Sequence, residues 1–416
     1  MEAGVPHPRP RLQGGASARS GKYAAACELT CVSINPEPTS SQESAGRAMV
    51  RVPDRKKRIL LQQQDDAAPG AVLVQPGKFP RGEVVTIEPG TVRVAVVQAA
   101  PVFMDTDASL TKAVGLIADA ASKGASLAAF GEAWLPGYPI HALSSPDTEA
   151  WWELAAAYLD QAVDLNSPII DTLCSAAQAS NIDIVIGLAE KEPTTRGSVY
   201  STLVFVGRDG QIFGRHRKLK PASQERCVWA DGDAIGLQAY DRGYAQLTGL
   251  TSTDHQMVLP TYALAEQGAQ IHVASWPGRE TMSAPSPLAA MSHQHLLSRA
   301  FAIQTGSYVL CAGSTLTRDD LPAKYQHFLT QELTGNSVII DPRGEIIAGP
   351  AQGEQTIVAE CAMNLIRAAK VAFDCAGHSA RRDLLRLSVE VDQEFDQGGE
   401  PKGDYPPSDD QFEPSS

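Results

Sequence analysis

Short runs of β-branched residues alternate with longer segments of helical apolar spacing from about Val92 to Val389. This alternation most limits the fold, because strands interleaved with helices predict an α/β architecture in which helices cover a sheet. The first strand is expected over residues 92–97. The helix that follows is expected to begin with Asp107 or Ser109 as its N-cap.

Several later segments continue the pattern, and two of them are strand pairs joined by short turns. Their joining residues, Arg208-Asp209-Gly210 and Asp341-Pro342-Arg343-Gly344, are typical of hairpins. Hairpins among crossovers indicate a mixed sheet rather than a purely parallel one. The expected elements are strands over 127–130, 183–188, 271–274 and 308–312, helices over 168–181 and 293–305, and hairpins over 199–213 and 337–348.

The two ends of the chain lack this pattern. Residues 1–90 are rich in Pro, Gly, Ser and Gln, which predicts a poorly ordered N-terminal extension. Residues 391–416 contain several carboxylates against the single Lys402, which predicts a flexible acidic tail. One folded domain is therefore expected over residues 91–390.

The composition narrows the range of partners. A net charge of -13 and a pI near 5.2 argue against a nucleic-acid surface. The sequence has no apolar run of about 18 residues, which argues against a membrane span. Its seven cysteines are scattered without metal-ligand spacing, which predicts a reducing, cytoplasmic setting and no metal or organic cofactor.

Three segments contain residues suited to catalysis. Glu132 follows the strand expected over 127–130 and precedes a turn rich in Gly and Pro, where it is a candidate general base or an ordinary solvated carboxylate. Lys218 and Glu225 lie in a charged segment that is either a solvated surface or a site that stabilises an oxyanion. Ser252 lies in a turn where Ser and Thr commonly act as helix caps.

Taken in order, these segments resemble the nitrilase branch of the carbon-nitrogen hydrolase superfamily. The segment Phe130-Gly131-Glu132-Ala133-Trp134-Leu135-Pro136-Gly137-Tyr138-Pro139 is similar to the family's Phe-Pro-Glu-Ala-Phe-x-Pro-Gly-Tyr-Pro, with Gly131 in place of its proline. The segment His216-Arg217-Lys218-Leu219 is similar to the family's His-Arg-Lys-Leu, and Glu225-Arg226 and Trp229 follow it. Segments 336–350 and 376–387 extend the resemblance to most of the chain between Val92 and Val389.

This resemblance implies a four-layer α-β-β-α sandwich and hydrolysis of a small nitrile or amide. It implies Glu132 as general base, with Lys218 and Glu225 stabilising the intermediate. It also implies a homo-oligomer, for which the segment from Asp147 to Leu165 is the expected contact.

The sequence departs from the family at the nucleophile. Where the family has Gly-Leu-Ile-Cys-Trp-Glu, this chain has Gly249-Leu250-Thr251-Ser252-Thr253-Asp254, so Ser252 stands at the position of the catalytic cysteine. A hydroxyl ionises far less readily than a thiol near neutral pH, so hydrolysis through Ser252 demands more of the general base.

Other readings of the site remain open. One is a catalytically silent binding or assembly protein of the same fold, and another is a non-hydrolytic enzyme, such as a dehydratase or an amide-forming enzyme. Two replacements for the thiol are also considered: Cys227, which would more commonly be a buried structural thiol, and a proton relay through Asp254 and His255.

Overall fold

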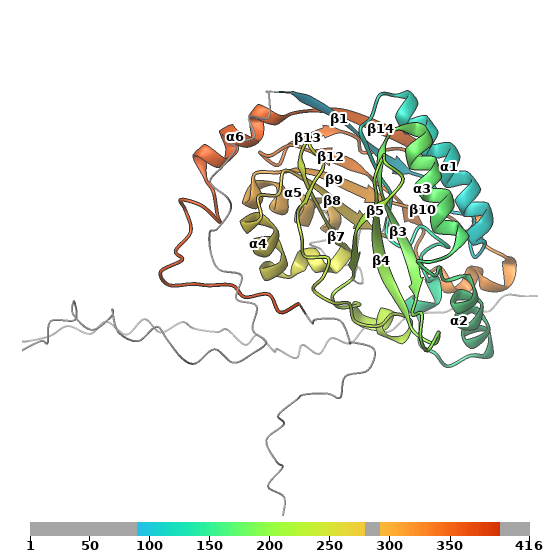
Figure 1. Ribbon diagram of the computed structural model, residues 1–416. Coiled ribbons are helices and arrows are strands. Elements are labelled where there is room, and N and C mark those ends of the chain that lie inside the picture. The colour runs from blue at the N-terminus through green and yellow to red at the C-terminus, as the bar shows by residue number, and fades with distance from the viewer. Residues whose placement is uncertain (1–89, 279–291, 392–416) are drawn as a thin grey trace, which may run out of the picture. The chain divides into compact units, whose positions relative to one another are not determined.

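Two six-stranded mixed sheets form the centre of the computed structural model, which describes residues 90–278 and 292–391 (Figure 1). The first sheet has the order β14-β1-β2-β3-β4-β5 and the second β13-β12-β9-β8-β7-β6. The first contains β1 (Thr91–Gln98), β2 (Leu127–Ala129), β3 (Asp183–Lys191), β4 (Val199–Val206), β5 (Ile212–Arg217) and β14 (Gln355–Ala362). The second contains β6 (Tyr240–Asp241), β7 (Gln246–Thr251), β8 (Ile271–Trp276), β9 (Tyr308–Gly313), β12 (Val338–Ile340) and β13 (Ile346–Ala348).

Helices lie on the outer face of each sheet. The helices are α1 (Thr106–Ser122), α2 (Glu149–Gln161), α3 (Pro168–Ser180), α4 (Val258–Glu266), α5 (His293–Thr305) and α6 (Met363–Ala372). Figure 1 shows α1 and α3 beside the first sheet and α4 and α5 beside the second. A short pair, β10 (Thr315–Leu316) and β11 (Leu333–Thr334), forms a separate sheet. None of the helices in the described ranges is long and apolar enough to cross a membrane.

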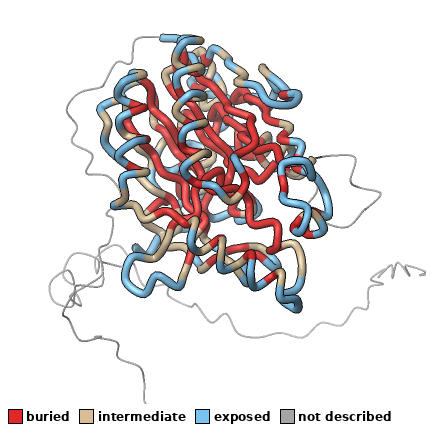
Figure 2. Tube along the Cα trace, turned by 90° about the vertical axis from the view of Figure 1, so that its right-hand side faces the viewer, coloured by how far each residue is buried: buried red, intermediate tan, exposed pale blue. Residues whose placement is uncertain are grey.

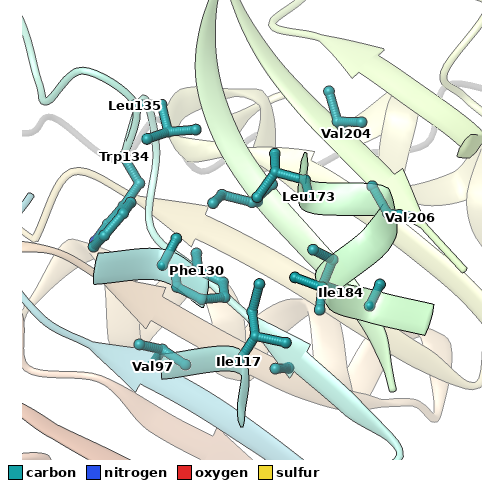
Figure 3. Packing of buried hydrophobic residues seen from close by; sticks show 14 of the residues in the cluster. Val97, Ile117, Phe130, Trp134, Leu135, Leu173, Ile184, Val204 and Val206 are labelled. Atoms are coloured by element: carbon teal, nitrogen blue, oxygen red, sulfur yellow. The ribbon is translucent and has the colours of Figure 1, made fainter. Parts of the chain in front are cut away.

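Alternating side chains explain how the central strands are buried on both faces. On β1, Ala95 and Val97 pack with α1 and α3, and Val94 and Val96 pack with the second sheet. Figure 3 shows the helix side of this arrangement, where Val97 and Phe130 lie near Ile117 of α1. In Figure 2 the buried part of the chain follows the strands through the middle of the molecule. The predicted four-layer α-β-β-α sandwich is confirmed.

Strand directions bring several loops to one edge. β1, β2 and β3 are parallel, β4 is antiparallel to β3, and β5 is antiparallel to β4, so β2, β3 and β5 run the same way. In the second sheet β7, β8 and β9 are parallel. Segments that follow β2 and β5 therefore leave the first sheet at a common edge, and those that follow β7 and β8 leave the second sheet together.

Most predicted elements are present, with differences at their ends. The N-cap of α1 is Asp105, whose side chain accepts a hydrogen bond from the Ala108 amide, so the prediction of Asp107 or Ser109 was wrong. Ser109 instead bonds the Val102 backbone from inside the helix. Apart from residues 90 and 391, the predicted extension over 1–90 and tail over 391–416 lie outside the described residues.

Candidate active site

Glu132 lies in a tight turn directly after β2. Its backbone N–H donates to the Trp276 carbonyl at the end of β8 (3.0 Å), which ties this turn to the second sheet. The turn also crosses β3 at Gly187, where an added Cβ would lie 2.3 Å from the Gly131 carbonyl oxygen and 2.9 Å from the Glu132 Cα. Only glycine at position 187 leaves room for the Glu132 backbone to lie this close to the strand.

Lys218 lies directly after β5 and bonds two carboxylates. Its Nζ donates to Glu132 Oε1 (2.9 Å) and to Glu225 Oε2 (2.6 Å), and it lies 5.1 Å from the centroid of the Trp229 ring. All three charged side chains are buried. Buried charges need partners, and here one ammonium lies between two carboxylates.

Further hydrogen bonds fix the two carboxylates. Glu225 lies in the short helix η2 (Ser223–Cys227), accepts a hydrogen bond from the Tyr138 hydroxyl at Oε1 (2.7 Å), and accepts one from the Ala222 amide at Oε2 (2.7 Å). Glu132 Oε1 also accepts from the Ser201 hydroxyl (3.1 Å). Within the described residues, Glu132 Oε2 has no hydrogen-bond partner.

Burial and neighbouring charges shift the pKa values of Glu132 and Lys218. Burial raises the pKa of Glu132 to about 7, and the adjacent Lys218 offsets part of this effect. Burial by itself lowers the pKa of Lys218, but Glu132 and Glu225 together outweigh it and raise that pKa above its ordinary value. The arrangement thus holds a permanent cation beside a carboxyl group that titrates near neutrality, as general-base chemistry requires.

Ser252 lies directly after β7, at the start of the short helix η3 (Ser252–Gln256). Thr251 pairs with Ser275 of β8, and the next residue of β8, Trp276, accepts a hydrogen bond from the Glu132 amide at its carbonyl oxygen. The turn at Ser252 and the turn at Glu132 therefore leave the two sheets close to each other. Ser252 has a φ of 46°, which is uncommon for a residue with a side chain. Its hydroxyl is fully buried and has no hydrogen-bond partner among the described residues.

Asp254 connects the Ser252 turn to the Lys218 segment. Its Oδ2 bonds His216 Nε2 (2.9 Å) and accepts the Leu219 amide (3.2 Å), and these residues flank Lys218 on both sides. His255 instead places Nδ1 on the carbonyl oxygen of Ser252 (2.8 Å) and Nε2 on His272 (3.0 Å). Both of its ring nitrogens have partners other than the Ser252 hydroxyl, so this geometry does not support a relay through Asp254 and His255.

Cys227 and Cys311 lie in contrasting surroundings. Cys227, at the end of η2, is exposed, so the expectation that it would be a buried structural thiol was wrong. Cys311 is buried in β9, and burial raises the pKa of its thiol to about 12. In the described part of the chain no group of three or more His, Cys, Asp or Glu residues could hold a metal ion.

A family model described as carbon-nitrogen hydrolase matches residues 93–371. The chain belongs to the carbon-nitrogen hydrolase family. Its relatives include a protein named Nitrilase 2 from an unknown prokaryotic organism, 45% identical over 72% of this chain and 93% of that protein. An aliphatic nitrilase from Rhodococcus rhodochrous is 33% identical over 72% of this chain and 82% of its own. Identities of 33% and 45% over most of each relative's length agree with this family membership.

Solved structures agree with the fold of this carbon-nitrogen hydrolase. A carbon-nitrogen hydrolase from Helicobacter pylori has a TM-score of 0.57 at 17% identity, and the match covers 71% of this chain and 97% of that one. A branch 10 member of the nitrilase superfamily from Saccharomyces cerevisiae has a TM-score of 0.54 at 22% identity, over 70% of this chain and 96% of its own. At these identities the likeness shows the fold alone.

In this carbon-nitrogen hydrolase the structure joins three of the four predicted site residues by direct bonds and places the fourth, Ser252, on a neighbouring turn. The sequence analysis did not single out Ser201 or Gly187, which lie on strands and carry no local signal. Tyr138 lies within the segment 130–139 that resembles the family, and that resemblance is the signal that could have identified it as a site residue.

Proposed function

We propose that this chain hydrolyses a small nitrile or amide, with Ser252 as nucleophile and Glu132 as general base. The observation that carries the proposal is the free Oε2 of Glu132, on a buried carboxylate whose other oxygen is held by Lys218. A carboxylate fixed through one oxygen can accept a proton at the other without losing its orientation.

In the proposed reaction Glu132 takes the Ser252 hydroxyl proton as Oγ bonds to the nitrile or carbonyl carbon. Lys218, held by Glu132 and Glu225, stabilises the negative charge that develops on the substrate nitrogen or oxygen. With an amide, the proton returns to the leaving nitrogen, ammonia departs and an ester remains on Ser252. With a nitrile, the proton goes to the substrate nitrogen to give an imidate on Ser252, one water adds to the imidate carbon, and ammonia departs to leave the same ester. Water then cleaves that ester, so the net reaction consumes one water per amide and two per nitrile.

The backbone conformation and the position of Ser252 support its assignment as nucleophile. A positive φ outside glycine is kept where the surroundings impose it, and such residues concentrate at functional sites. The turn also follows the carboxyl end of β7, a usual place for catalytic groups in α/β folds. A hydroxyl is a weaker nucleophile than a thiolate at neutral pH, so slow turnover is expected.

The test is release of ammonia from a panel of aliphatic and aromatic nitriles and amides, with acid and amide products measured separately. Separate measurement matters because a relative from Nicotiana tabacum is named a bifunctional nitrilase/nitrile hydratase. The native chain is expected to turn over, and Ser252→Ala and Glu132→Gln are expected to lose activity.

Cys227→Ser is the matched control, because it removes the exposed thiol nearest in sequence to Glu225. It is expected to keep full activity. Loss of turnover in Cys227→Ser with retention in Ser252→Ala would transfer the nucleophile role to the thiol. No product of any kind from the native chain would favour a silent binding protein, and condensation or dehydration products would favour a non-hydrolytic enzyme.

We also propose that the chain forms a homo-oligomer through the segment from Asp147 to Leu165, which contains α2. The side of α2 that carries Trp152 supports this, because that residue is 62% exposed and aromatic residues are enriched at protein interfaces. Light scattering of the native chain and of Trp152→Glu tests it. A monomeric native chain, or an oligomer unchanged by Trp152→Glu, would contradict this contact.

A further inference from the structure

Three buried side chains behind the Ser252 turn form a continuous series of hydrogen bonds. Thr248 Oγ1 lies 2.8 Å from His272 Nδ1, His272 Nε2 lies 3.0 Å from His255 Nε2, and His255 Nδ1 lies 2.8 Å from the carbonyl oxygen of Ser252. Thr248 and His272 are direct partners on the neighbouring strands β7 and β8. None of these groups belongs to the proposed Glu132 and Lys218 chemistry.

When His255 is neutral, the last bond of the series fixes the direction of all the others. A carbonyl oxygen can only accept, so His255 must carry its proton on Nδ1. Neutral His255 then has a lone pair on Nε2, and His272 must donate to it from its own Nε2–H. His272 Nδ1 is left as an acceptor, and the Thr248 hydroxyl is the donor that satisfies it.

Both imidazoles must be neutral for this arrangement to exist, because a second proton on His255 would place two N–H groups face to face, and one on His272 would occupy the nitrogen that accepts from Thr248. Their surroundings favour the neutral form. Burial lowers the pKa of His255 to about 4, and burial also lowers the pKa of His272 well below its ordinary range. The ionisable groups that act on this pair are Asp254, which favours the charged form of His255, and His216, which opposes it.

Aromatic contacts hold the two rings in the required planes. His255 stacks on Trp276 with centroids 5.1 Å apart and an interplanar angle of 24°. His272 stacks on Phe301 of α5 with centroids 3.7 Å apart and an angle of 18°. The hydrogen-bonded series is therefore braced by β8 on one side and by α5 on the other.

We propose that Thr248, His272 and His255 form a one-directional hydrogen-bond chain that positions the Ser252 turn by holding its carbonyl oxygen. The Ser252 hydroxyl has no hydrogen-bond partner among the described residues, so its place depends on the backbone of its turn. That backbone has a positive φ, and the hydrogen-bond chain holds it through the contact between His255 and the Ser252 carbonyl oxygen. These three are positioning residues, and their effect on turnover rests on the proposed function of Ser252.

The first test reads the chain without any activity measurement. The native protein is labelled with 15N-histidine, and two-bond 1H–15N spectra near pH 7 are assigned through the His255→Asn and His272→Asn variants. We expect His255 in the Nδ1–H form and His272 in the Nε2–H form. An Nε2–H form of His255, or an imidazolium at either position, would overturn the proposal.

The second test removes the first donor of the chain. Thr248→Val keeps the shape of the side chain but lacks the hydroxyl, Thr248→Ser keeps the hydroxyl, and Thr305→Val removes a buried hydroxyl at the end of α5 that bonds elsewhere. Thr248→Val alone is expected to shift the His272 and His255 nitrogen signals and to speed amide hydrogen exchange in residues 252–256. Equal exchange in this turn for all three variants and the native chain would overturn the positioning role.

Kinetics then separate this proposal from the proposed function. For an active chain, Thr248→Val is expected to lower kcat about 10-fold with KM unchanged, because misplacing a reacting group costs rate more than binding. Thr248→Ser should restore the native kcat. If the native protein showed no turnover, only the proposed function would be contradicted. The histidine tautomers and the amide hydrogen exchange rates would still decide whether the hydrogen-bond chain holds the Ser252 turn.

Discussion

The charged cluster of Glu132, Lys218 and Glu225 and the turn at Ser252 are held in place in different ways. In the cluster each side chain bonds another side chain directly, and Tyr138 and Ser201 add further bonds. In the turn the Ser252 side chain contributes no hydrogen bond within the described residues, and its backbone is held instead through His255.

Substitutions in the charged cluster and at Ser252 should therefore differ in their effect on stability. Removing one member of the cluster leaves another charge buried without its partner, which costs stability as well as function. Replacing the Ser252 side chain by one of similar size breaks no hydrogen bond that the structure describes. The side chain at position 252 can therefore change while the cluster stays intact.

The largest effect is expected from Lys218→Met, which leaves Glu132 and Glu225 buried without their shared cation. Breaking a buried ion pair at one partner costs about 3 to 5 kcal/mol, so the free energy of unfolding should fall by an amount of this order. Turnover should disappear as well. Urea unfolding followed by tryptophan fluorescence measures the first effect, and ammonia release measures the second.

Lys324→Met is the control for that variant, because Lys324 pairs with Glu153 at the surface with both side chains more than half exposed. Exposed ion pairs contribute little, so no measurable change in the urea midpoint is expected. If both substitutions altered stability equally, the cluster would not differ from an ordinary surface pair, and the contrast with the Ser252 turn would be lost.

The next effect is a gain of activity in Ser252→Cys. A thiol with a pKa near 8.5 supplies some thiolate at pH 7, whereas a serine hydroxyl supplies essentially none, so turnover should rise at least about 10-fold. The urea midpoints of Ser252→Cys and Ser252→Ala should stay close to that of the native chain, since neither breaks a described hydrogen bond. A folded Ser252→Cys that is no faster than the native chain would show that more than the nucleophile has changed.

A smaller effect is expected from pH. Glu132 acts as a base only when ionised, and its raised pKa of about 7 means that the active form is lost as pH falls below that value. The rate should fall about 10-fold for each pH unit below 7 and level off above it. His255, with a pKa lowered to about 4, stays neutral across this range. A flat profile of kcat/KM between pH 5 and 8 would exclude Glu132 as the titrating base.

The sequence predicted most strands and helices from local pattern, whereas the four-layer arrangement of these elements came from the resemblance to a known family. In β1 the run of β-branched residues predicts a strand directly, and the structure shows that its alternate side chains face the helices on one side and the second sheet on the other. β14 was missed because much of it is only half-buried or exposed, so its sequence shows no continuous apolar run. The following α6 also escaped prediction, although Met363 and Ile366 anchor it to the core.

For the site, the sequence located its members but not the contacts among them. The order of Glu132, Lys218 and Glu225 was informative because it matched a known family. Ser201, His272 and Thr248 could not be found in the same way, because their partners lie 69, 17 and 24 residues away along the chain. Such contacts depend on which strands become neighbours, and this information is absent from any short segment.

The smallest effect is expected from Asp254→Asn, which weakens the one described link between the two regions. Asp254 accepts from His216 and from the Leu219 amide on either side of Lys218, and an amide of the same shape keeps one acceptor oxygen but loses the charge. A charge-assisted hydrogen bond contributes about 1.5 to 3 kcal/mol, so a loss near the lower end and a kcat about 3-fold lower are expected.

Asp233→Asn is the matched control, since it removes a carboxylate that bonds Arg215 and Arg217 next to Lys218 without a described bond to the turn. Thermal unfolding and kcat are compared for the two variants. A lower kcat in Asp254→Asn alone would mean that the cluster and the turn depend on each other through His216 and Leu219. Equal kcat values in both would mean that the two regions are positioned independently, the cluster by its own charges and the turn by the backbone contacts of Ser252.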